Sequence, residues 1–180
     1  MASSRFLWIP FQSYRKVDGK VCLCEIFQKA GTWFAAIVVD RPEPSIKPNG
    51  RILAIDLGVY NVAACVDETG QGVVYSGKGL LTIQHYFNKQ IAKVQQRLNT
   101  RQKRISAGLR ALYWKRGMQI SQNVDKITTH LIAVAVGQGI TTLVVGDFTH
   151  IRNQMHFGAK TNQKLHAWSF KQIITQFTYK

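Results

Sequence analysis

Arg51–Gly58 has the sequence RILAIDLG, a short apolar run that ends on an acid, a leucine and a glycine. No charge interrupts Ile52–Ile55, and such runs are typical of a core strand that is buried on both faces of its sheet. A carboxylate in that position requires a cation or a set of donors, because burying an unpaired ion is costly. Two interpretations of Asp56 follow: it is a metal ligand, or it caps the turn Gly58–Asn61.

The charge balance is the strongest feature of the composition. The 180 residues include 24 Lys and Arg against 9 Asp and Glu, for a formal net charge of +15. Such a field favours a polyanionic partner, and nucleic acid above all, through counterion release. No stretch has the length of a membrane span and the N-terminus lacks the features of a signal peptide, so we expect no membrane association and a cytoplasmic location. We expect Cys22, Cys24 and Cys65 to be reduced core thiols.

The chain divides by pattern into three parts. Residues 1–40 alternate aromatic and polar positions and predict strands of a small antiparallel sheet or the end of a barrel. Residues 41–50 contain three prolines in a polar run and predict a linker. Residues 51–180 begin with a predicted meander of three strands at 51–57, 62–66 and 72–76.

A basic helix is predicted over residues 82–106, where apolar residues recur at steps of three and four. No acid occurs from Thr69 through Val124, so nothing neutralises the other face of this helix, and we expect it to contact nucleic acid. Between Gly108 and Gly117 we expect a basic loop whose aromatic residues either stack on a strand or simply pack. The cations predicted to bind nucleic acid are Lys89, Lys93, Arg97, Arg101, Lys103, Arg104, Arg110, Lys115 and Arg116.

A second strand ending in an acid completes the predicted sheet. A helix over about 118–136 leads to the apolar strand 140–147, which ends at Asp147, and a further helix is predicted over 164–178. Two helices between the meander and this strand require a crossover, so the strand should lie parallel to the first and beside it. Asp56 and Asp147 should then lie at the same end of adjacent strands.

These motifs in order closely resemble the TnpB/OrfB transposon-encoded proteins, which are relatives of the type V CRISPR effector nucleases. The likeness rests on the order of five segments: Ala54–Val59, the basic helix, Asn123–Lys126, Leu143–Phe148 and Trp168–Lys180. The resemblance implies an α/β, partial RNase H-like (RuvC) fold over 51–180, preceded in residues 1–40 by the remnant of a wedge-type β-barrel. It also implies a Mg²⁺-dependent, RNA-guided DNA endonuclease, commonly labelled a transposase, with DNA and guide RNA as partners.

Three departures from the family pattern bear on activity. The family's first catalytic Asp matches Asp56, but its second acid is usually a Glu where this chain has Gly146, which leaves Asp147 one residue along. The chain stops at Lys180, before the family's third catalytic Asp and its zinc ribbon, and it begins midway through the barrel. A two-metal site needs more carboxylates than Asp56 and Asp147. We therefore expect a fragment that retains nucleic-acid affinity, or alternatively a non-catalytic module such as a repressor or a guide-RNA-binding remnant.

Overall fold

The structure is a computed structural model in which two compact units, Met1–Ser45 and Ile46–Lys180, follow one another along the chain. It describes residues 9–13, 16–29, 31–42, 50–102, 104–147 and 168–180. Its strands are β1 (Lys20–Lys29), β2 (Thr32–Asp40), β3 (Arg51–Asp56), β4 (Asn61–Asp67), β5 (Gly72–Ser76) and β6 (Ile140–Val145). Its helices are α1 (Lys78–Thr100), α2 (Ala107–Gly137) and α4 (Phe170–Tyr179).

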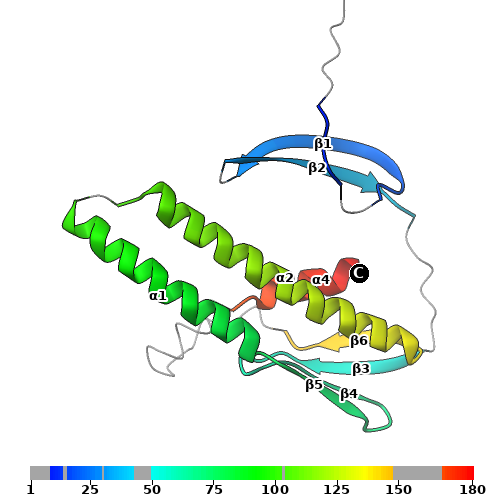
Figure 1. Cartoon of the computed structure of the whole chain (residues 1–180). Helices are drawn as coiled ribbons and strands as arrows, with labels where there is room; N and C mark the ends of the chain where they lie inside the picture. Colours follow the sequence, from blue (N-terminus) through cyan, green and yellow to red (C-terminus); the bar gives the residue numbers. More distant parts are fainter. Residues whose placement is uncertain (1–8, 14–15, 30, 43–49, 103, 148–167) are drawn as a thin grey trace, which may run out of the picture. The chain divides into compact units, whose positions relative to one another are not determined.

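The first unit contains an antiparallel hairpin of β1 and β2 (Figure 1). Gly31 turns the chain with a φ of +84°, a backbone conformation that suits glycine, and the rings of Phe27 and Phe34 stack across the hairpin at 5.7 Å. The predicted antiparallel pairing is confirmed for β1 and β2, whereas the described residues before Lys20 form no strand and the barrel remnant stays a prediction. The expectation of core thiols is wrong for Cys22 and Cys24, because every position of β1 is exposed.

The second unit is built on a mixed sheet of four strands in the order β5-β4-β3-β6. Strands β3, β4 and β5 form the predicted antiparallel meander. Strand β6 pairs with β3 in parallel, as the crossover argument predicts. Gly77 ends the meander where no other residue fits, because a Cβ there would lie 2.3 Å from the carbonyl oxygen of Val59.

Only one face of this sheet is buried within the described residues, which corrects the expectation for the central strand. Along β3, Leu53 and Ile55 are buried whereas Ile52, Ala54 and Asp56 are exposed. Residues paired across strands share a face, so Val66 and Val144, which pair with Ala54, lie on the same open side and are exposed too. Asp56 is therefore not a buried carboxylate.

The two long helices differ from the prediction at their ends. Helix α1 begins four residues earlier than predicted and ends at Thr100 rather than residue 106. Helix α2 begins at Ala107, so the loop predicted between Gly108 and Gly117 is wrong: this stretch is helical. Its start is fixed by the Ser106 hydroxyl, which accepts a hydrogen bond from the Leu109 N–H at 3.1 Å. A glycine lowers the stability of a helix by only about 1 kcal/mol. Burying the Leu109 side chain stabilises the fold by more than that.

Helices α1 and α2 form an antiparallel hairpin that extends past the sheet (Figure 1). Near the sheet, α2 packs through Val124, Leu131 and Ala135 against the buried face of β3. Farther out, Phe87, Ile91 and Leu98 of α1 form a separate small core with Leu109. The hairpin thus carries its own apolar seam and presents its outer surface to solvent. None of the helices in the described part of the chain has the length and apolar character needed to span a bilayer.

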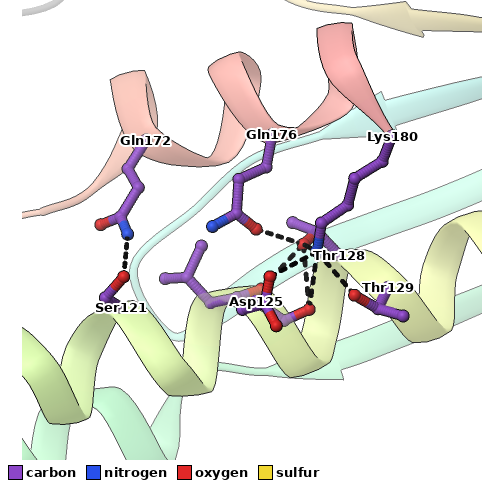
Figure 2. A network of polar contacts seen from close by, with 8 residues as sticks. Ser121, Asp125, Thr128, Thr129, Gln172, Gln176 and Lys180 are labelled. Carbon is purple, nitrogen blue, oxygen red and sulfur yellow. Dashed lines mark hydrogen bonds and ion pairs between the residues drawn. The ribbon is translucent and has the colours of Figure 1, made fainter. Parts of the chain in front are cut away.

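Helix α4 is held on α2 by a row of polar contacts (Figure 2). The fully buried Thr128 hydroxyl donates to Oε1 of Gln176 and accepts from the Lys180 ammonium at 2.8 Å. The same ammonium pairs with the Asp125 carboxylate at 2.9 Å. One turn away, Gln172 donates to the Ser121 hydroxyl at 2.9 Å. The last helix was predicted to begin at residue 164, but residues 164–167 lie outside the described residues.

Candidate functional site

Two carboxylates lie at one edge of the sheet, where β3 and β6 end together. Asp56 is the last residue of β3, and Ile55 before it pairs with Val145, the last residue of β6. Asp147 follows two residues after Val145, and both acids are exposed. Because neighbouring strands lie about 4.8 Å apart, the structure places these two predicted residues at the same edge, as expected.

The alternation of side chains along a strand fixes the face of Asp56 but does not fix the face of Asp147. Asp56 belongs to the open face of the sheet, because it alternates with Ile55 along β3. Continued alternation would place Asp147 on the opposite face, together with Val145. Strand β6 ends at Val145, however, so the pleat no longer dictates the direction of Asp147. Within the described residues, no hydrogen bond from the following turn reaches the Asp56 carboxylate, so the turn cap proposed for it is not formed there.

The fit of a metal ion to this edge follows from the donors present. Mg²⁺ is commonly bound by one or two carboxylates, with waters and substrate phosphates completing its octahedron. Asp56 and Asp147 are donors of the type, and of the number, that such a Mg²⁺ site uses. A pair of metal ions needs more ligands, and the part of the chain that the structure describes contains no group of three or more His, Cys, Asp or Glu that could hold a metal.

The buried carboxylate of this sheet is Asp67, which the sequence analysis missed. It lies at the end of β4, where it forms an ion pair with Arg51 and accepts hydrogen bonds from the Thr69 hydroxyl at 2.7 Å and from the Thr69 and Gln71 N–H groups. These contacts, the Thr69 hydroxyl foremost, hold the pKa of Asp67 below its usual value. The signal in the sequence is an Asp two residues before a Thr in a turn. Asp67 is structural, because the Thr69 and Gln71 contacts close its own turn and the Arg51 ion pair joins the end of β4 to β3.

The basic residues predicted on the first helix form a continuous stripe on α1. Lys89, Lys93 and Arg97 are exposed and recur every four residues, and exposed Arg101 follows directly after the helix. Lys89 lies opposite the buried Phe87, Ile91 and Leu98, because a helix advances about 100° per residue, and each later cation lies about 40° further round the helix. The basic stripe consists of Lys89, Lys93, Arg97 and Arg101.

The other predicted cations do not join the basic stripe. Arg110 and Lys115 are exposed on α2 but lie about 140° apart around that helix. Arg116 is only partly exposed, and its guanidinium donates to Oδ1 of Asn88 at 2.9 Å. Arg104 is exposed in the connection between the helices, and Lys103 lies outside the described residues.

Comparison with known proteins identifies the family. The model of the family OrfB_IS605, described as "Probable transposase", matches residues 36–152, which is more than half of the chain. The chain belongs to the OrfB_IS605 family. No curated protein matches it. Among solved structures, the chain is similar to one titled "Cryo-EM structure of the Cas12f1-sgRNA-target DNA complex", with 15% identity and a TM-score of 0.49. The match covers 85% of this chain and 37% of that one.

The part of the chain matched by the OrfB_IS605 family contains both features described above. Residues 36–152 include the carboxylate edge, with Asp56 and Asp147, and the whole basic stripe on α1. Helix α4 and most of the β1–β2 hairpin lie beyond the matched range. The family's defining region in this chain is therefore the sheet together with the α1–α2 hairpin.

Proposed function

We propose that this chain binds nucleic acid through the basic stripe of α1, as part of a TnpB-like, RNA-guided DNA endonuclease with an RNase H-like (RuvC) fold. DNA and a guide RNA are the partners. The observation that carries the proposal is the row of exposed cations on α1, which begins at Lys89 on the side opposite the apolar seam of the hairpin and meets no acid along the helix. Membership of the OrfB_IS605 family, described as probable transposase, supports the same class of partner.

The geometry of the stripe suits a phosphate backbone. From Lys89 to Arg101 the stripe spans about 18 Å of helix, at 1.5 Å per residue. No acidic residue occurs on α1. Each cation that neutralises a phosphate releases condensed counterions, which makes such binding strong at low salt and insensitive to sequence.

The test is the salt dependence of binding to a labelled DNA duplex. Replacing Lys89, Lys93 and Arg97 by Gln should weaken binding and reduce the slope of log K against log salt by up to about 2.7, since each lost phosphate contact removes about 0.9. A matched control replaces three exposed cations elsewhere, Lys16, Lys20 and Lys126, with the same change in net charge.

The control should keep the parent slope within about one unit. An unchanged slope in the stripe variant would remove α1 from the interface. Equal losses in both variants would show that net charge alone, and not the stripe, accounts for binding.

The carboxylate edge is the proposed acidic site of the endonuclease. Asp56 and Asp147 would hold Mg²⁺, and the ion would polarise a phosphodiester oxygen and activate a water for attack on the phosphorus. This chain would supply the two carboxylates, and its basic stripe would bind the nucleic-acid strand. Cleavage of DNA that requires Mg²⁺ and is lost in Asp56→Asn would support the endonuclease. Salt-sensitive binding without any cleavage would support a non-catalytic binding module instead.

A further inference from the structure

A pocket of about 240 Å³ opens between α1, α2 and the start of α4. It is separate from the carboxylate edge, and its walls combine amide, hydroxyl, guanidinium and aromatic groups. It is smaller than the roughly 300–1,000 Å³ of sites for drug-sized ligands. The residues that line it are Gln84, Asn88, Tyr113, Arg116, Gly117, Ile120, Ser169 and Gln172.

One wall of the pocket is held in place by contacts between α1 and α2. The Arg116 guanidinium lies over the Tyr113 ring, 5.1 Å from its centroid, and donates to Oδ1 of Asn88 at 2.9 Å. The Tyr113 hydroxyl in turn accepts a hydrogen bond from the Gln95 amide at 3.3 Å. A flat cation and a ring fixed in this way offer a stacking surface that loses little side-chain entropy when a ligand binds.

A glycine of α2, Gly117, is among the residues that line the pocket. Gly117 lies on the inward stripe of α2, three residues before Ile120 and seven before the buried Val124. A Cβ at Gly117 would nevertheless meet no atom within 4 Å. Glycine inside a helix lowers helix stability relative to almost any other residue. A side chain at this position would occupy the pocket.

We propose that this pocket receives one unpaired nucleobase from a single strand that runs along the basic stripe. The inference rests on the proposed function and adds a site to it. A base can stack on the guanidinium plane of Arg116, and the amides of Asn88 and Gln172 offer the donors and acceptors that base edges require. Lys89, the first residue of the basic stripe, directly follows Asn88 in α1 but lies about 100° round the helix from it, so the strand would cross the side of α1 between the stripe and the pocket. A duplex keeps its bases stacked inside and cannot fill the pocket.

The test compares a labelled 12-nucleotide single strand with the blunt duplex of the same sequence, by fluorescence anisotropy. Gly117→Leu fills the pocket with a better helix former. We expect it to weaken binding of the single strand by about 5- to 150-fold, the range for one lost base stack, and to leave duplex binding within twofold. The matched control is Gly79→Leu, another helical glycine with open space around it, which should bind both probes like the parent.

A second variant guards against an effect of Gly117→Leu on folding. Arg116→Lys keeps the positive charge but removes the planar guanidinium on which a base would stack. It too should therefore weaken binding of the single strand and not of the duplex. Parent-like binding of the single strand by Gly117→Leu would overturn the pocket assignment, as would equal losses on both probes. If the pocket variants have no effect while the stripe variant changes the salt slope, the base site is wrong and the proposed function stands. If the stripe variant has no effect either, the proposed function fails as well.

Discussion

Replacing Thr128 by Val tests whether the polar contacts between α2 and α4 hold the last helix in place. Thr128 is 0% exposed and Gln176 is 6% exposed, so neither side chain can exchange its partner for bulk water. Valine has nearly the shape of threonine but cannot donate. The Gln176 Oε1 atom would keep its burial and lose its hydroxyl donor.

The expected cost is that of a buried acceptor without a partner, about 1–3 kcal/mol. At roughly 2–4 °C per kcal/mol for a chain of this size, the melting temperature should fall by roughly 2–12 °C. The Lys180 ammonium limits the loss, because it keeps the Asp125 carboxylate and the Thr129 hydroxyl when it loses Thr128 (Figure 2).

A double-mutant cycle separates this cost from a simple loss of packing. In Gln176→Leu alone, the Thr128 hydroxyl can donate its one proton to the Val124 carbonyl oxygen, 3.0 Å away, so this change should cost less than Thr128→Val. In the double variant both partners are apolar, and stability should return to within about 1 kcal/mol of the parent. Thermal and urea unfolding followed by circular dichroism measures all four proteins. Additive losses in the double variant would refute the reasoning, because they would show that the two side chains act independently.

Three further predictions concern single side chains. The pKa of Asp67 is lowered in the fold, so its carboxylate contributes stability above its ordinary value near 4, and that stability is lost as pH falls through the lowered value. Melting temperature should therefore fall less between about pH 5 and pH 2 in Asp67→Asn than in the parent, and parallel curves would contradict this. Burial raises the pKa of Cys65 to about 11, so at pH 8 a disulfide reagent should label Cys22 and Cys24 rapidly and Cys65 only after denaturation; three fast thiols would contradict the burial. Mg²⁺ at ten times its dissociation constant should stabilise the parent by about 1.4 kcal/mol and Asp56→Asn not at all, and an unresponsive parent would refute the metal assignment.

The sheet was predictable because its strands are short and separated by clear turn signals. Two long helices between the meander and β6 leave a parallel crossover as the natural connection, and the structure has that pairing. The stripe on α1 was predictable too, because an acid-free face shows in the sequence without any knowledge of packing. Arg51 and Asp67, by contrast, lie 16 residues apart, and no local pattern indicates that they pair.

The error over residues 108–117 has a physical explanation that also bears on the pocket. Two glycines nine residues apart predict loop boundaries, since glycine is the weakest helix former after proline. Packing overrides that preference: Ser106 caps α2, and Leu109 is buried in the seam that it forms with Phe87 of α1. The glycine signal was therefore real, but its cause is different for Gly117. That residue lines the pocket, and a Cβ there would meet no atom within 4 Å.

The error over the central strand has a different source. An uncharged run such as Ile52–Ile55 is expected when both faces of a strand are buried, yet only Leu53 and Ile55 are buried here. Because Ala54 is small and uncharged, the run carries no polar residue that would reveal the open face. The consequence for Asp56 is chemical. A carboxylate on an exposed face keeps its hydration, so a metal ion is not required for the fold to form. Any stabilisation by Mg²⁺ at Asp56 then reports binding, and not the relief of a buried charge.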